Sequence, residues 1–180
     1  MAGVIAKDRS LAVDAVRNSE AVAKALIGAL VSHQDVQVRL EAVKLAAEAR
    51  TAEIVPQLLP ALADQEPAIR REAIAVLERY PDQRAVVPLC ELLLTAEDRD
   101  QAVRCLQKMG PLVEDTVIKG LNHSDPAVVQ ACCRVLERAG TQKSLPELER
   151  LLRHADRSVQ TAAKRAGERI MRLGGQPRGR

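Results

Sequence analysis

The stretch DVQVRLEAVKLAAEA at residues 35–49 decides the fold, because its pattern returns four more times along the chain. The further copies are EPAIRREAIAVLERY at 66–80, TAEDRDQAVRCLQKM at 95–109, DPAVVQACCRVLERA at 125–139 and DRSVQTAAKRAGERI at 156–170. Each copy is anchored by a small residue, and these anchors, spaced by 31, 29, 30 and 31 residues, are Ala42, Ala73, Ala102, Cys132 and Ala163. One period before Ala42 lies Ala12, in a partial copy. Such a period is typical of repeat proteins.

The apolar residues within each copy follow helical spacing. In the second copy they are Ile69, Ala73, Val76, Leu77 and Tyr80, which share one face of an α-helix. Each copy is preceded by another apolar helical segment, at residues 21–31, 52–62, 84–94, 111–121 and 144–152. Because no segment alternates as a strand would, the sequence predicts an all-α fold of paired helices.

Polar residues mark where the second helix of a pair begins. Asp35, Asp125 and Asp156 each stand seven residues before an anchor, where a carboxylate can accept hydrogen bonds from the first backbone N–H groups. Pro67 and Pro126 fall at or near the first helical position, where a missing N–H does no harm. These residues predict helix starts immediately after 35, 66, 125 and 156.

The repeats resemble those of HEAT-repeat proteins, in the short subclass of about 30 residues named after the bilin (PBS) lyases. The resembling motifs are DVQVRLEA at 35–42, EPAIRREA at 66–73, RAVVPL at 84–89 and LNHSDPAVV at 121–129. The resemblance covers residues 9–172 and implies a right-handed α-solenoid of stacked helical hairpins. It implies about five repeats and a partial N-terminal one, with second helices on the concave side. Residues 1–172 are therefore predicted to form one domain, and residues 173–180 a flexible basic tail.

The family pattern also carries an Arg three residues before the anchor. It is present here as Arg39, Arg70 and Arg99, but it is replaced by Val129 and Gln160. The resemblance therefore implies an Asp–Arg ladder along the turns that is strong early in the chain and broken late.

Composition excludes several classes of function. Among 180 residues there is no Trp, no Phe and only one Tyr, which argues against stacking platforms for nucleic-acid bases. Charged residues interrupt every apolar run, and this predicts no membrane span and no membrane partner. The N-terminus MAGVIAKDRS has no signal-peptide pattern, and the four cysteines sit in apolar helical segments, so we expect reduced thiols and a cytoplasmic location.

The three histidines share one position of the repeat. His33, His123 and His154 each stand nine residues before an anchor and two before an Asp. Packed helices lie about 8–10 Å apart, too far for histidines of successive repeats to share a metal ion. We therefore interpret them as polar turn residues beside helix caps and predict no metal and no cofactor. The residues that follow them also lack the repeated His-Glu pairs of the iron-binding family that resembles deoxyhypusine hydroxylase.

The candidate binding site is a stripe of cations. Net charge is +3, but residues 1–120 carry 15 basic and 18 acidic side chains, whereas residues 121–180 carry 12 and 6. Two and six residues after the anchors, three successive second helices carry pairs of cations one turn apart, which we name the basic stripe: Arg104 and Lys108, Arg134 and Arg138, Arg165 and Arg169. The alternative interpretation is a solvated face in which Glu137 pairs with Arg134, Glu168 pairs with Arg165 and Glu78 approaches the next repeat.

These patterns predict a non-enzymatic protein–protein interaction module, whose basic stripe favours acidic protein segments. The first alternative is a sequence-nonspecific binder of nucleic-acid phosphates; the resembling HEAT-like DNA glycosylases need aromatic residues that this chain lacks. The second is an enzyme or enzyme subunit resembling the bilin lyases, for which no catalytic residue can be matched here. The partial first repeat is also consistent with a chain that belongs to a larger protein or complex.

Overall fold

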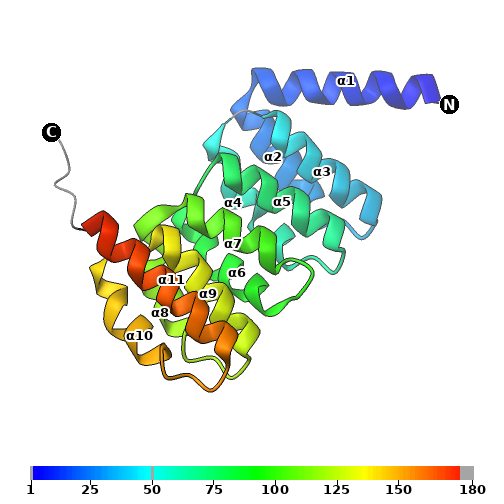
Figure 1. Ribbon diagram of the computed structural model, residues 1–180. Helices are drawn as coiled ribbons and strands as arrows, with labels where there is room; N and C mark the ends of the chain where they lie inside the picture. The colour runs from blue at the N-terminus through cyan, green and yellow to red at the C-terminus, as the bar shows by residue number, and fades with distance from the viewer. Residues whose placement is uncertain (1, 50, 175–180) are drawn as a thin grey trace, which may run out of the picture. The chain divides into compact units, whose positions relative to one another are not determined.

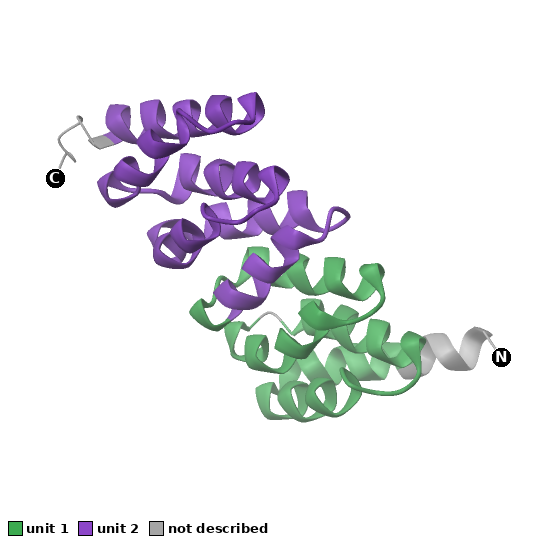
Figure 2. Cartoon of the chain, turned by 90° about the horizontal axis from the view of Figure 1, so that it is seen from below, with its two compact units in different colours: residues 1–84 green, residues 85–180 purple. Residues whose placement is uncertain are grey.

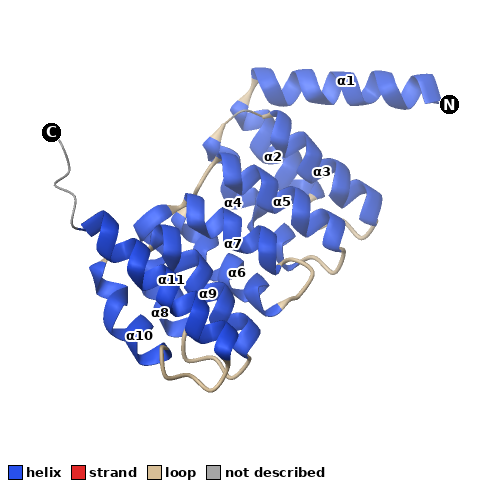
Figure 3. Cartoon of the chain, viewed as in Figure 1, coloured by secondary structure: helices blue, strands red, loops and turns tan. Residues whose placement is uncertain are grey.

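The computed structural model describes residues 2–49 and 51–174, with side chains from residue 9 to residue 173. Every regular element in these described residues is helical, and they contain no strand (Figure 3). Residues 175–180 of the predicted basic tail lie outside the described residues. Leu173 and Gly174, which were predicted to begin that tail, are the last residues of a helix. The all-α prediction is confirmed.

Five helical hairpins follow one N-terminal helix, α1 (Ala2–Asn18), in chain order (Figure 1). The hairpins are α2 (Glu20–Leu30) with α3 (Val36–Glu48), α4 (Val55–Leu58) with α5 (Pro67–Arg79), α6 (Val86–Glu91) with α7 (Arg99–Lys108), α8 (Glu114–Gly120) with α9 (Pro126–Ala139), and α10 (Leu145–Leu151) with α11 (Arg157–Gly174). This order matches five repeats and a partial sixth, with α1 as the second helix of the partial repeat.

The chain forms two compact units, residues 1–84 and residues 85–180 (Figure 2). Within the first unit, α1 packs against α2 and α3, and α3 packs against α5. Within the second, α9 packs against both α7 and α11, while α6 packs against α8. First helices therefore stack on first helices and second helices on second helices, which is the arrangement of an α-solenoid.

The later first helices are broken into short pieces, because prolines and 3₁₀ turns interrupt them. The 3₁₀ segments are η1 (Ala52–Ile54), η2 (Leu59–Ala63), η3 (Gln83–Ala85), η4 (Leu92–Leu94), η5 (Gly110–Val113) and η6 (Gln142–Ser144). Pro56 and Pro146 occupy the second positions of α4 and α10, where a missing N–H is tolerated. In α6, Pro88 is followed by only three more α-helical residues.

The second helices begin where the caps predict. Asp35 accepts a hydrogen bond from Gln37 N at 2.7 Å, and Asp125 accepts one from Ala127 N at 2.8 Å. Asp156 accepts from Ser158 N at 2.7 Å and, more weakly, from Val159 N. Pro67 and Pro126 are the first residues of α5 and α9. These helix starts are confirmed.

The anchors lie in the core, and their small size lets helices approach closely. All five are at most 2% exposed. At Gly120, the last residue of α8, an added Cβ would lie 2.6 Å from Cys132 Sγ of α9. A larger side chain at either position would push these two helices apart. An aromatic ring at either position would therefore not fit between α8 and α9.

The arginines three residues before the anchors donate hydrogen bonds to the turn before their own helix, and Arg39 and Arg99 also approach an Asp of the next repeat. Arg39 donates to both carboxylate oxygens of Asp64, at 2.6 and 3.1 Å, and to two carbonyl oxygens of its own turn. Arg99 likewise donates to two carbonyl oxygens of its turn, but its nearest Asp125 oxygen is 3.9 Å away. Gln160 keeps one such bond, to His154 O at 2.6 Å, and Val129 has no side chain that can make one. The ladder weakens along the chain as predicted.

Candidate functional site

The basic stripe lies on three helices of the unit formed by residues 85–180. Its members are Arg104 and Lys108 on α7, Arg134 and Arg138 on α9, and Arg165 and Arg169 on α11. Because α9 packs between α7 and α11, the structure brings the three pairs onto adjacent helices. Arg134 is half-buried and the others are exposed.

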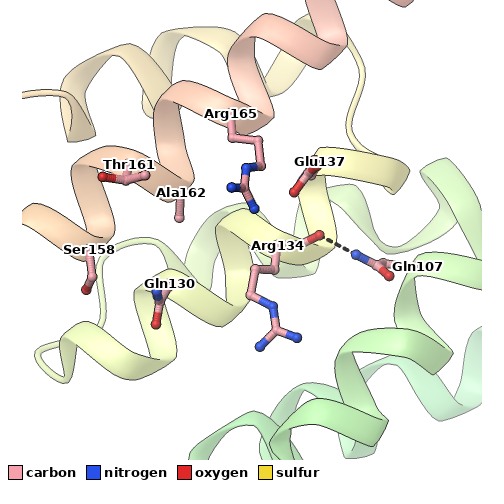
Figure 4. A pocket seen from close by; sticks show the side chains of 8 residues that line it. All are labelled: Gln107, Gln130, Arg134, Glu137, Ser158, Thr161, Ala162 and Arg165. Atoms are coloured by element: carbon pink, nitrogen blue, oxygen red, sulfur yellow. Dashed lines mark hydrogen bonds between the residues drawn. The ribbon is translucent and has the colours of Figure 1, made fainter.

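A hollow of about 340 Å³ lies on the seam between α9 and α11, which run side by side (Figures 1 and 4). We name it the seam hollow, and its lining residues are Gln107, Gln130, Arg134, Glu137, Ser158, Thr161, Ala162 and Arg165. Most of them carry hydrogen-bonding groups and two carry guanidinium groups. This surface suits a polar, negatively charged ligand better than an apolar one.

A second hollow of about 200 Å³ adjoins the first, because Glu137 and Arg165 line both. We name it the C-terminal hollow, and its other lining residues are Arg169, Arg172 and Leu173. Sequence analysis missed Arg172, since it lies outside the pairs at two and six residues after the anchor. Its spacing of three residues from Arg169 places it on the same helix face and could have identified it.

Arg134 is bound within the structure. Its Nη1 lies 2.7 Å from Asp100 Oδ1 of α7. The hydrogen bond and charge of Arg134 lower the pKa of Asp100 below its ordinary value, and Arg104 and Arg99 add to the effect. Asp100 is therefore ionised at neutral pH, and it neutralises part of the stripe.

The remaining arginines of the stripe are not neutralised in this way. Within the described residues, no carboxylate oxygen lies within 4.0 Å of a guanidinium nitrogen of Arg104, Arg138, Arg165 or Arg169. The two local pairs considered from the sequence are also not formed. Arg134 binds Asp100 instead of Glu137, and Glu168 lies 3.9 Å from Lys164 Nζ instead of pairing with Arg165. That part of the alternative interpretation is wrong.

Only half of the basic stripe lines the two hollows. Arg134, Arg165 and Arg169 line the two hollows, whereas Arg104, Lys108 and Arg138 line neither of them. Polar residues that the sequence did not single out, such as Gln107 and Thr161, complete the seam hollow. They occupy positions where adjacent helices meet, and only the packing of α7, α9 and α11 shows which of them share a surface.

The histidines serve the helix caps. In each of the three turns, histidine Nδ1 accepts a hydrogen bond of 3.0 Å from the backbone N–H of the following Asp: His33 from Asp35, His123 from Asp125 and His154 from Asp156. This bond confirms the interpretation as turn residues. Across residues 2–49 and 51–174, no group of three or more His, Cys, Asp or Glu side chains is placed to hold a metal ion.

The cysteines are free thiols, of which Cys105, Cys132 and Cys133 are buried and Cys90 is half-buried. Burial raises the pKa of Cys90 to about 11 and those of Cys132 and Cys133 to about 12. Because the thiolate is the nucleophile, burial lowers the reactivity of these three residues at neutral pH. The interpretation of the cysteines as small residues of the core is confirmed for the three buried ones.

Comparison with known proteins supports the repeat architecture. The family model described as HEAT repeats matches residues 23–107 and 95–166. No curated protein matches the chain. In the described residues, none of the helices combines the length and apolar character needed to cross a membrane.

Solved structures with the same fold include two engineered proteins. One has a TM-score of 0.50 and 18% identity, over 96% of this chain and 92% of its own. The other has a TM-score of 0.51 and 20% identity, over 91% and 90%. An archaeal HEAT-like repeats protein from Thermococcus onnurineus NA1 has a TM-score of 0.46 and 17% identity, over 93% and 97%. At these identities, the two engineered proteins show the fold alone.

Proposed function

Because the chain belongs to the HEAT-repeat family, we propose that it is a non-enzymatic interaction module that binds an acidic segment of a partner protein. Helical repeat folds of this kind are typical of protein-interaction scaffolds. The proposed binding surface comprises the seam hollow and the C-terminal hollow, on second helices that we expect to line the concave side. We propose that the protein acts in the cytoplasm, where its free thiols would stay reduced.

The observation that carries this proposal is that Arg165 and Arg169 line these hollows and that, in the described residues, neither forms an ion pair with a carboxylate. Guanidinium groups bind carboxylates in a planar, two-point geometry, so each can hold one acidic side chain of a partner. Arg172 adds a third cation to the same face of α11. An acidic segment laid along α11 would meet all three.

Nucleic acid is the alternative ligand, and the composition of the surface favours protein over it. The residues that line both hollows include no aromatic side chain, so single-stranded bases would find nothing to stack on. Contact with a phosphate backbone would still use the six cations of the stripe. Six such contacts would give a slope of about −5 for log affinity against log salt concentration.

The test compares two charge-reversal variants of the full chain with equal net charge. Arg165→Glu with Arg169→Glu removes the proposed site. The matched control, Lys119→Glu with Arg153→Glu, reverses two exposed cations on α8 and in the turn after α10. The probe is a synthetic peptide of alternating Glu and Ser, titrated by fluorescence anisotropy at low salt.

We expect the site variant to bind the peptide at least about tenfold more weakly, and the control to change affinity less than about twofold. Circular dichroism spectra should show that both variants stay helical. Equal weakening by both variants would reduce the effect to net charge and overturn the proposal. If a short DNA duplex bound with the steep salt slope and the peptide did not bind, the nucleic-acid alternative would replace it.

A further inference from the structure

One acidic residue lies in the centre of the proposed binding surface. Glu137 of α9 lines both the seam hollow and the C-terminal hollow, and among the described residues that line them it alone carries a carboxylate. It is half-buried, and Figure 4 shows its carboxylate beside Arg165 at the seam with α11. A carboxylate at this place lowers the attraction of the surface for anions.

Glu137 forms no ion pair with the cations of the stripe in the described residues. Within the described residues, no Lys or Arg nitrogen lies within 4.0 Å of its carboxylate oxygens. Arg134, one turn before it, points away from Glu137 (Figure 4) and pairs with Asp100. The described part of the unit therefore gives Glu137 no internal ion pair.

The equivalent residues of the neighbouring helices do have internal partners. Gln107 stands five residues after the anchor of α7, and its Nε2 donates to Arg134 O at 2.5 Å. Glu168 stands at the same position of α11, and Lys164 Nζ lies 3.9 Å from it. The first contact links α7 to α9, and the second links two turns of α11. Glu137 occupies the same position of the repeat and, like Gln107, lines the seam hollow, but its side chain has no such internal contact in the described residues.

We propose that Glu137 determines the specificity of this surface, by binding a cationic side chain of a partner segment that is otherwise acidic. The inference rests on the proposed function, since it concerns the same two hollows. A uniform polyanion, whether polyglutamate or a phosphate backbone, would bring like charge against Glu137 and bind less well. A segment in which one Lys or Arg interrupts the acidic residues would satisfy Glu137 and the arginines together. The partner is thus a mixed-charge protein segment.

The experiment measures a selectivity ratio with the full chain. The two probes are the alternating Glu–Ser peptide and the same peptide with one central Ser replaced by Lys. Glu137→Gln should tighten binding of the first about threefold and weaken binding of the second about threefold, so the ratio changes by about tenfold. Glu168→Gln, at the equivalent position of α11, is the matched control and should leave the ratio unchanged within about twofold.

The outcomes separate this inference from the proposed function. If Arg165→Glu with Arg169→Glu weakens both peptides while Glu137→Gln leaves their ratio unchanged, the specificity role is wrong and the binding site stands. If the double variant affects neither peptide, the proposed function itself fails. A short DNA duplex gives an independent check, because Glu137→Gln should tighten its binding about as much as that of the all-acidic peptide.

Discussion

In residues 1–84, the charged side chains two or six residues after the anchors Ala42 and Ala73 bind within their own unit. Lys44 Nζ lies 3.0 Å from Glu41, Glu48 forms an ion pair with Arg17 of α1, and Arg79 donates to Ala47 O at 2.9 Å. In residues 85–180, Arg165 and Arg169 occupy the same positions of the repeat and line hollows instead. One surface of the fold thus contributes to internal contacts in the first unit and is open to a ligand in the second.

The difference shows that repeats of one architecture can use the same positions in two ways. One set of repeats uses them for internal contacts, and the other leaves them available for the proposed ligand. Exposed ion pairs of the kind seen in the first unit stabilise a protein by at most about 1 kcal/mol each. The second unit therefore loses little stability by leaving Arg165 and Arg169 without ion pairs in its described residues. Its strong polar contacts lie elsewhere, at the buried Glu114, where α8 meets the turn before α10.

The largest expected effect is at this buried contact. Glu114 is 5% exposed and accepts hydrogen bonds from Thr141 N and Thr141 Oγ1, both at 2.8 Å, and from the fully buried Ser144. Glu114→Ala would leave these donors without an acceptor, and it should lower the free energy of unfolding by about 3 kcal/mol in a urea titration. Glu147→Ala, on the surface of α10, should cost less than about 0.5 kcal/mol. A loss below about 1 kcal/mol for Glu114→Ala would contradict the expectation.

The second effect concerns the buried ion pair of the first unit. Burial opposes ionisation of Asp64, but hydrogen bonds from Arg39 and from the backbone N–H of Glu66 outweigh it and lower its pKa below the ordinary value. A carboxyl group with a lowered pKa stabilises the fold above its ordinary value of about 4, and this contribution is lost as pH falls through the lowered pKa.

Asp64→Asn should therefore lower the Tm by about 5 °C at neutral pH, and this difference from the wild type should shrink on acidification below about pH 4. Thermal melts followed by circular dichroism between about pH 3 and pH 7 measure both quantities. Asp14→Asn, on the exposed face of α1, serves as the control. A constant difference across this range would show that the charge of Asp64 does not matter.

The third prediction concerns a variant of the second unit in which Arg165 receives a local ion pair like that of Lys44 in the first unit. Ala162 lies three residues before Arg165 and lines the seam hollow, and the equivalent position before Lys44 holds Glu41. Ala162→Glu should give Arg165 a local ion pair and weaken binding of the alternating Glu–Ser peptide about fivefold, with stability changed by less than about 0.5 kcal/mol. Ala162→Gln has similar size without the charge. Equal weakening by both variants would indicate obstruction of the hollow rather than neutralisation of Arg165.

The smallest expected effect comes from a variant that frees Arg134 from its ion pair. Asp100→Asn removes the charge that binds Arg134, so the peptide should bind about threefold more tightly at neutral pH. The gain should disappear when Arg134→Gln is added to the variant. If it persisted, the effect would come from net charge and not from Arg134.

The repeat pattern predicts most of this fold, because anchors, caps and prolines act locally. Asp125 and Pro126, for example, set the start of α9 through their own backbone. The first helices were less predictable. Residues 84–94 read as one apolar helix, but they divide into η3, α6 and η4. Pro88, the third residue of α6, lacks the N–H group that a continuous α-helix would use at this point.

The sequence grouped cations of the candidate site on single helices, but it did not predict their ion-pair partners, because such partners can lie far away along the chain. Spacing identifies cations on one helix face, and it correctly grouped Arg165 with Arg169. It could not reveal that Arg134 pairs with Asp100, because these residues are 34 positions apart and meet through the packing of α7 against α9. An arginine can pair with a carboxylate on its own helix or on a neighbouring helix, and only the packed structure shows which pair forms.

The scarcity of aromatic residues has a practical consequence for measurement. Tyr80, the only aromatic residue, ends α5 as its C-terminal cap and is half-buried in the first unit. Its fluorescence and near-ultraviolet signal therefore report on residues 1–84 alone, whereas the helical signal in the far ultraviolet reports on both units. Coincident unfolding curves from the two signals would identify one cooperative transition, and separated curves would give the stability of each unit without any added label.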